Sequence, residues 1–164
     1  MVVSIDGWVT LRLTASEVGL REVEFMAADE WHAGGHPADQ RVRPTLVETE
    51  RQLRAYFAGE LKQFHLPLDM QGTPFQLRVW NELLRIPFGE TRSYAQMAQA
   101  IGKDKAVRAV GAANGANPVP IVVPCHRVIG SGGKLVGFGG GLPLKRRLLE
   151  LEGVLPARLA CAMD

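Results

Sequence analysis

The chain has 164 residues, 46% of them hydrophobic and 22% charged, which is typical of a soluble globular protein of one domain or two small ones. No apolar stretch approaches the ~20 residues that cross a membrane, and residues 1–6 lack the basic and apolar regions of a secretory signal, so we expect no membrane association. Two cysteines, Cys125 and Cys161, do not make a disulfide framework, and we therefore expect a cytoplasmic, reducing setting.

The net charge of +2 is distributed unevenly along the chain. Residues 1–70 carry 7 Lys/Arg and 11 Asp/Glu, a net of −4, whereas residues 71–164 carry 12 and 6, a net of +6. A basic half is typical of a protein that binds a polyanion, although many proteins with this balance bind no nucleic acid. The charge alone therefore favours a polyanion partner for the second half and leaves a nucleic acid as one alternative.

Residues 1–70 are predicted to form a small α/β domain. Alternation of apolar and polar side chains indicates half-buried strands, and apolar side chains at helical spacing indicate one helix. The predicted elements are a strand at 8–14, a turn at 16–19, a strand at 20–25, a loop at 29–43, a helix from Pro44 to Gly59 and a short edge strand at 66–68.

Residues 71–164 are predicted to be mainly helical, after a linker near 69–72. Thr73 and Ser93 are each placed to cap a helix, Ser93 in a Ser-x-x-Gln capping box. The predicted helices are one from Pro74 to about Leu83, one through Met97–Ile101, one capped by Asp104 that runs to about Ala113, and one that starts near Pro143. The second and third, joined by a turn with a glycine, have the pattern of a helix-turn-helix.

Cys125 lies in the most informative segment, between Pro124 and His126. The apolar run 121–123 before it is predicted to form a short buried strand that ends at the proline, which would fix the thiol at the strand exit. By itself, a Cys-His pair is more typical of a buried structural cysteine than of a nucleophile. The surrounding sequence reverses that preference.

The segment Asn117–Val128 reads NPVPIVVPCHRV and resembles the active-site signature of the O6-alkylguanine-DNA alkyltransferases, also called methylated-DNA–protein-cysteine methyltransferases. The resemblance covers about residues 72–153 and includes TRSY at 91–94, RAVG at 108–111 and LLELEG at 148–153, and it is looser before residue 70. It implies an α+β two-domain fold. A small ribonuclease-H-like α/β domain at 1–70 would support a winged-helix-like, helix-turn-helix domain at 71–164 that binds DNA and accepts the alkyl group.

The resemblance implies four catalytic residues. Cys125 would attack the alkyl carbon on guanine O6, and His126 would take the thiol proton through a water molecule while Glu152 holds its other nitrogen, which is the logic of a catalytic triad. Tyr94 would help rotate the nucleotide out of the helix and donate a hydrogen bond to the leaving guanine. Read without the resemblance, Glu152 is more typical of a solvated acid and Tyr94 of a core aromatic.

The helix at 105–115 is the candidate DNA element, although it has few long polar side chains with which to read base edges. Its small side chains suit either a close approach to a groove or a tightly packed helix pair. The resemblance places it in the minor groove, with Arg108 filling the gap left by the flipped nucleotide and with Ala109, Gly111 and Ser93 beside the DNA.

Other matched residues shape the predicted pocket. Asn117 would brace the turn before the active-site segment, the Val128 carbonyl would face the guanine amino group, and Arg127 would make structural hydrogen bonds. The predicted pocket residues are Asn117, Pro120, Val128, Phe138, Gly139 and Gly140. Phe138 stands where the family often has tyrosine and Gly139 where some members have serine, so we expect a roomier pocket that admits alkyl groups larger than methyl.

We expect no cofactor and no structural zinc. No cysteine precedes Cys125. Of the remaining histidines, His32, His36 and His65, the first two flank a Gly-Gly loop rather than a helix face. Cys161 has no motif around it. The expected partner is double-stranded DNA with alkylated bases, bound by a monomer, with cooperative binding left open.

The resulting prediction is direct, single-turnover DNA repair, in which the O6-alkyl group of guanine, and the O4-alkyl group of thymine, moves irreversibly to Cys125. The alternative is a non-catalytic sensor of alkylation damage, but such relatives lack the cysteine. A cysteine hydrolase would need an oxyanion site and a base from a distant segment, and a redox sensor would need a resolving cysteine nearby.

Overall fold

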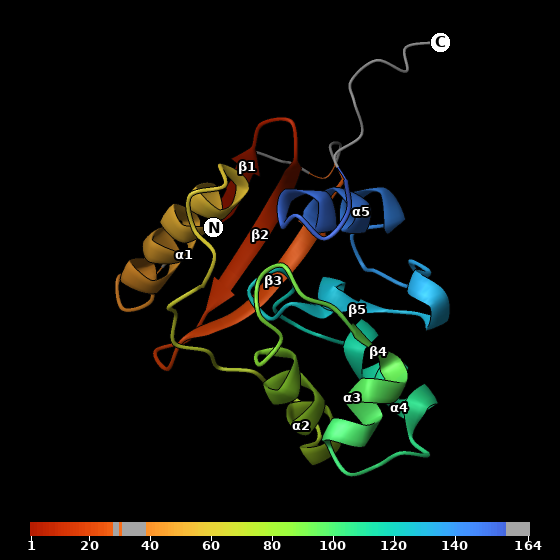
Figure 1. The fold of residues 1–164 in the computed structure, drawn as a ribbon. Coiled ribbons are helices and arrows are strands. Elements are labelled where there is room, and N and C mark those ends of the chain that lie inside the picture. Colours follow the sequence, from red (N-terminus) through yellow and green to blue (C-terminus); the bar gives the residue numbers. More distant parts are fainter. Residues whose placement is uncertain (28–29, 31–38, 157–164) are drawn as a thin grey trace.

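In a computed structural model of the chain, residues 1–27, Glu30 and 39–156 are described, and they form two packed units (Figure 1). The first unit consists of β1 (Val2–Ile5), β2 (Val9–Ala15), β3 (Leu20–Met26) and α1 (Arg43–Phe57). Both predicted strands and the predicted helix are confirmed, and β1 adds a strand that was not predicted. Most of the predicted loop at 29–43 and all of Cys161 lie outside the described residues.

The three strands form an antiparallel sheet in the order β1-β2-β3, and α1 packs against it (Figure 1). The pairing of Leu13 with Val23 places both side chains on the face that α1 covers, where Leu53 and Tyr56 are fully buried. Alternation in the strands and helical spacing in α1 thus build one apolar core. The predicted edge strand at 66–68 is reduced to a single parallel bridge between Leu68 and Leu20.

The second unit is mainly helical. Its elements are α2 (Pro74–Leu83), β4 (Arg92–Ser93), α3 (Tyr94–Ala100), α4 (Val107–Gly115), a 3₁₀ turn η1 (Cys125–Arg127), β5 (Val128–Ile129), a second 3₁₀ turn η2 (Ser131–Gly133) and α5 (Leu142–Leu151). The two short strands β4 and β5 pair in parallel. Figure 1 places α2, α3 and α4 together at one end of the molecule, and α5 packs against η1.

Local sequence signals set two of the helix starts. Thr73 and Ser93 each accept a hydrogen bond from the glutamine three residues later, and each glutamine side chain accepts one in return, so α2 and α3 both begin with a complete capping box. The predicted cap at Asp104 is wrong. A turn closed by the bond from the Ala106 N–H to the Lys103 carbonyl delays α4, which begins at Val107 without a side-chain cap.

The predicted strand at 121–123 is also wrong. These residues are buried but form a turn, in which the Val123 N–H donates to the Val119 carbonyl and Ile121 has a φ of 75°. The Asn117 side chain accepts from the Val119 N–H at 2.9 Å and donates to the Val123 carbonyl at 2.8 Å. Prolines on both sides of the run remove the donors that a strand ladder needs, so the apolar residues are buried as a turn.

The two units are in direct contact. The Val23 N–H of the edge strand β3 donates to the Pro118 carbonyl at 2.9 Å, and the Tyr56 hydroxyl of α1 donates to Glu152 just after α5. The chain passes from one unit to the other through the stretch after α1 and before α2, which contains the predicted boundary at residue 70. These contacts place the first unit against the segment that carries Cys125.

Candidate active site

Cys125 begins the 3₁₀ turn η1 and is 6% exposed. Its carbonyl accepts a hydrogen bond from the Asn114 side chain on α4. Burial raises the pKa of the Cys125 thiol, and the side chain of Asn117 and the positive charge of Lys145 oppose that rise. At neutral pH the resting side chain is therefore a thiol, and it needs a base to become the thiolate that attacks.

A buried base lies next in the chain. His126 is fully buried, and its Nε2 lies 2.7 Å from Glu152 Oε1. Burial lowers the pKa of His126, although Glu152 opposes that change. When the imidazole is neutral and carries its proton on Nε2, it donates a hydrogen bond to the Glu152 carboxylate. Its Nδ1 then has a free lone pair, and no hydrogen-bond partner for Nδ1 exists among the described residues. The arrangement leaves one basic nitrogen ready to accept a proton.

Glu152 is the centre of a buried network that joins both units. Arg127 donates from Nε to Oε2 and from Nη2 to Oε1, each at 2.9 Å, and Tyr56 donates to Oε1 at 2.7 Å. Burial by itself would raise the pKa of Glu152, but the hydrogen bonds from His126 and Arg127 outweigh it and lower this pKa to about 2. The carboxylate is therefore ionised while buried and can fix the orientation of His126.

Lys145 of α5 is a second buried charge, and nothing in the sequence analysis singled it out. Its Nζ donates to the carbonyls of Val128 at 2.7 Å, Val136 at 2.9 Å and Gly137 at 3.3 Å. Burial lowers the pKa of Lys145 to about 8. The sequence did contain a sign of this role, because Lys145 falls on the same helical face as the apolar Leu148 and Leu149. A charged side chain on an apolar face is buried only when it has hydrogen-bond partners.

The carbonyl contacts of Lys145 bear on the predicted pocket. Val128 is expected to present its carbonyl to a guanine amino group. Within the protein this oxygen accepts one hydrogen bond from Lys145, and its second lone pair can still accept another. Tyr94 is half-buried, and its hydroxyl donates to the Val136 carbonyl at 3.2 Å. Tyr94 and Lys145 therefore hold the same carbonyl, at the start of the loop that carries Phe138 and Gly139.

A cavity of about 360 Å³ lies beside Cys125. Of the predicted pocket residues, Asn117, Pro120 and Gly139 line it. Phe138 does not, and it packs against Phe25 of β3 at 5.5 Å and against the His126 ring at 6.4 Å, measured between ring centroids. Gly140 is closely packed, since an added Cβ would lie 2.8 Å from Leu144.

The first unit contributes one wall of this cavity through residues 22–25 of β3. This wall could not be predicted from the sequence. The strand β3 lies about a hundred residues before Cys125, and its own sequence does not specify which distant segment its edge will pack against. The contact between β3 and Pro118 is what brings it there.

Of the predicted DNA-binding residues, Arg108, Ala109 and Gly111 lie on α4, and Ser93 lies in β4 and caps α3. Arg108 and Ala109 are exposed. Ser93, Tyr94 and Gly111 line a shared shallow cavity of about 280 Å³. A Cβ added at Gly111 would meet only the Tyr94 ring, at 3.8 Å, which is an ordinary contact distance. Packing within the protein therefore does not require glycine at this position.

No cluster of three or more potential metal ligands occurs in the described ranges 1–27, 30 and 39–156. His32 and His36, which were weighed for zinc, fall outside these ranges. Over the same ranges, no helix is both long enough and apolar enough to span a membrane.

Comparison with known proteins agrees with this geometry. Residues 74–154 match the DNA binding domain of 6-O-methylguanine DNA methyltransferase, and residues 10–70 match its ribonuclease-like domain. A methylated-DNA–protein-cysteine methyltransferase of Methanosarcina acetivorans is 49% identical over an aligned length of 148 residues, and the match covers 86% of this chain and 90% of the relative. The chain belongs to this methyltransferase family. The resemblance read from the sequence is confirmed, as is a two-domain fold with a small sheet domain before a helical one.

Other members of the family extend the comparison. The methyltransferase of the same name from Mycobacterium tuberculosis is 64% identical over 101 residues, so the match spans 62% of this chain and 61% of that relative. A crystal structure of Mycobacterium tuberculosis OGT in complex with DNA superposes with a TM-score of 0.76 at 49% identity, covering 87% of this chain and 86% of that one. A structure from Methanococcus jannaschii, at 22% identity and a TM-score of 0.69, shares the fold.

Proposed function

We propose that the protein repairs DNA by moving the alkyl group of O6-alkylguanine to Cys125, once per molecule. The observation that carries the proposal is the buried set Cys125, His126 and Glu152, in which the cysteine directly precedes in sequence a histidine whose imidazole lies 2.7 Å from the carboxylate. Family membership supports the same reaction, because relatives over most of the chain are named methylated-DNA–protein-cysteine methyltransferases.

The reaction balances with groups that the chain supplies. His126 Nδ1 takes the thiol proton through a water molecule, and the thiolate attacks the alkyl carbon. The new S–C bond forms as the C–O6 bond breaks, and the electron pair passes to the guanine. The guanine then takes up one proton from solvent, and His126 returns the thiol proton to solvent. A hydrogen bond from Tyr94 stabilises the leaving base as its charge develops, for which the hydroxyl exchanges its bond to the Val136 carbonyl for one to guanine. The product is a thioether, which is stable, so the protein acts without turnover.

The proposed partner is duplex DNA that contains an alkylated guanine or an O4-alkylated thymine. We assign α3 and α4 as the helix-turn-helix of a winged-helix-like unit, with α4 in the minor groove and Arg108 in the place of the flipped nucleotide. The exposure of Arg108 and Ala109 supports this assignment, as does the crystal structure of the Mycobacterium tuberculosis relative in complex with DNA. The pocket assignment of Pro120 and Gly139 rests on their place beside Cys125.

Mass spectrometry tests the proposal directly. The protein is mixed with a duplex bearing O6-methylguanine, and the intact mass and the peptide masses are measured. We expect one added methyl group per molecule, on the peptide of Cys125, and none on Cys125→Ser. An unmodified protein that still binds the duplex would contradict the proposal and favour a damage sensor.

A further inference from the structure

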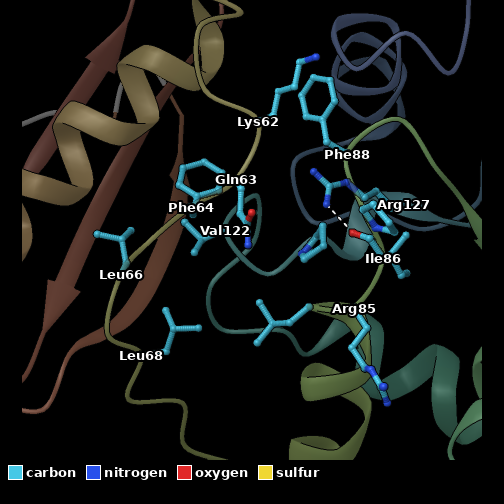
Figure 2. Close-up of a pocket in the computed structure, with 13 residues that line it drawn as sticks. Lys62, Gln63, Phe64, Leu66, Leu68, Arg85, Ile86, Phe88, Val122 and Arg127 are labelled. Atoms are coloured by element: carbon cyan, nitrogen blue, oxygen red, sulfur yellow. Dashed lines mark hydrogen bonds between the residues drawn. The ribbon is translucent and has the colours of Figure 1, made fainter.

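A groove of about 630 Å³ runs between the two units and shares no residue with the cavity beside Cys125. Figure 2 shows that one side of the groove comes from the stretch between α1 and α2 and the other side from residues that follow α2. The first side carries Phe64, Leu66 and Leu68, the second carries Arg85, Ile86 and Phe88, and Val122 lies between them. Leu84, also in the lining, is 43% exposed. The groove thus combines apolar side chains with polar and basic ones, and the described part of the chain leaves it uncovered.

The extended segment 64–68 has one backbone edge without partners. His65 exchanges two hydrogen bonds with the Gln52 side chain, at 2.9 and 3.0 Å, and the Pro67 carbonyl accepts from the Leu20 N–H at 2.8 Å. Backbone groups alternate in direction along an extended chain, so those at positions 64, 66 and 68 point away from these contacts. Within the described residues none of these groups has a hydrogen-bond partner. The segment therefore has an unpaired strand edge beside the groove.

The charged residues in the groove lining are all basic. Lys62 and Arg85 are exposed, and Arg127 completes the set, with no Asp or Glu among the lining residues. Arg127 is neutralised by its paired bonds to Glu152. Arg85 approaches Glu82 only at 3.6 Å with its side chain 74% exposed, which is a weak pairing. Two cations are thus available to an anionic occupant.

We propose that this groove binds an extended segment of a partner protein that alternates apolar and acidic side chains. Its main chain pairs with the edge at 64–68, its apolar side chains cover Leu84 and Leu68, and its carboxylates meet Lys62 and Arg85. Addition of a strand to a free edge is a recurrent mode of peptide recognition, in which main-chain bonds supply affinity and side chains supply specificity. The inference does not depend on alkyl transfer, since the groove and the cavity beside Cys125 share no lining residue.

Fluorescence anisotropy with dye-labelled peptides tests this site on the full chain. The probe is a peptide of four Leu-Glu repeats, compared with four Leu-Lys repeats and with a Leu-Glu peptide whose alternate backbone nitrogens are methylated. We expect the Leu-Glu peptide to bind and the other two to bind at least about tenfold more weakly. Reversing both groove cations, in the double variant Lys62→Glu, Arg85→Glu, should weaken binding of the Leu-Glu peptide at least about tenfold. The control is the double variant Arg43→Glu, Lys103→Glu, which reverses two exposed cations outside the groove and should leave binding of the peptide unchanged.

Other outcomes would overturn the proposal. Equal binding of the methylated peptide would show that no strand pairing occurs. Equal loss in both charge-reversal variants would show attraction to net charge alone. If a single-stranded oligonucleotide displaced the labelled peptide but unlabelled Leu-Glu peptide did not, the groove would be a nucleic-acid site. If the unliganded protein sedimented as a dimer whose interface is formed by the groove residues, the occupant of the groove would be a second copy of the chain. Alkyl transfer by the groove variants should stay unchanged, so the two proposals fail separately.

Discussion

At the scale of single residues, the carboxylate of Glu152 governs the site because three side chains donate to it. His126, Arg127 and Tyr56 come from two different units, and all are buried. A buried carboxylate costs several kcal/mol unless its oxygens are paired, so each donor contributes both to stability and to the orientation of the imidazole. Tyr56 has no place in the proposed chemistry and acts on the reaction only through Glu152.

Two tyrosine-to-phenylalanine changes should separate stability from chemistry. Tyr56→Phe removes a buried donor to a charged group and should lower the free energy of unfolding by about 1.5–3 kcal/mol. Tyr94→Phe removes a hydroxyl from a half-buried side chain and should lower stability by less than about 1 kcal/mol, but should slow methyl transfer at least about tenfold. Urea unfolding and single-turnover transfer to Cys125, measured on both variants, check the pair.

Each variant is the control for the other, because the chemical change is the same. If Tyr56→Phe left stability unchanged, the bond to Glu152 would carry no net energy. If Tyr94→Phe transferred methyl groups at the normal rate, the hydroxyl would have no part in the departure of guanine.

The roles of Cys125, His126 and Glu152 were all predicted through the family resemblance. Cys125 and His126 lie together in its most specific motif, whereas Glu152 lies 26 residues beyond His126. Tyr56 and Lys145 were missed for a physical reason. The partner of Tyr56 lies 96 residues away, and the partners of Lys145 lie in β5 and in the loop between η2 and α5. Such pairings depend on how the elements pack, and a local pattern does not carry that information.

At the scale of elements, α5 holds the loop beside the site through one side chain. Replacing Lys145 with methionine keeps a long apolar stem but leaves the carbonyls of Val128, Val136 and Gly137 without their common donor. We expect Lys145→Met to lower the free energy of unfolding by about 2–4 kcal/mol, because buried unpaired carbonyls cost about 1–3 kcal/mol each and water can reach some of them. Urea unfolding measures the loss, and Lys105→Met is the control at an exposed position. An equal effect in both variants would contradict the structural role of Lys145.

Helix α4, which we propose as the DNA-binding element, carries a glycine that the protein's own packing does not need. Gly111→Ala should raise the free energy of unfolding by about 0.5–1 kcal/mol through helix propensity, since the new methyl group meets only the Tyr94 ring at 3.8 Å. If α4 lies against the minor groove, the same methyl group should weaken duplex binding by about tenfold or more. Thermal unfolding and fluorescence anisotropy with a labelled duplex measure the two effects.

The matched change is Gly115→Ala, at the last residue of α4, where an added Cβ meets nothing within 4 Å. It should raise stability slightly and leave duplex binding unchanged. A Gly111→Ala protein that binds DNA normally would argue against α4 as the helix that enters the groove.

Helix starts with complete capping boxes were predictable, because the signal is local in Thr73 and Ser93. The segment at 121–123 was not, since an apolar run indicates burial but does not distinguish a strand from a turn. There the side chain of Asn117 supplies the hydrogen bonds that a neighbouring strand would otherwise supply. Asp104 failed as a cap because the chain turns once more before α4 begins.

At the scale of the whole molecule, the two units share one polar network and one cavity wall. Glu152 binds Tyr56 of α1, and β3 lines the space beside Cys125. The family resemblance predicted a supporting role for the first unit, but the positions of the supporting contacts depend on how the two units pack and could not be predicted from the sequence. Because the buried charges depend on both units for their partners, the protonation state of the network should affect the stability of the whole fold.

Acid should therefore unfold the protein in a way that depends on Glu152. The folded pKa of Glu152 is lowered from 4.5 to about 2, so its contribution to stability is fully present above pH 4.5 and is lost as the pH falls toward 2. Burial also lowers the pKa of His126 below 6.5, so protonation favours the unfolded chain as the pH falls below that value.

Urea unfolding at a series of pH values should show stability falling below about pH 6.5 and more steeply below about 4.5. Glu152→Gln, less stable at neutral pH, should show a shallower fall between about pH 4.5 and 2, because a glutamine takes up no proton. Other carboxylates with lowered pKa values, such as Asp69, remain in both proteins, so the difference between the two curves isolates Glu152. Parallel curves would show that this carboxylate is not the group that ties the stability of the fold to pH.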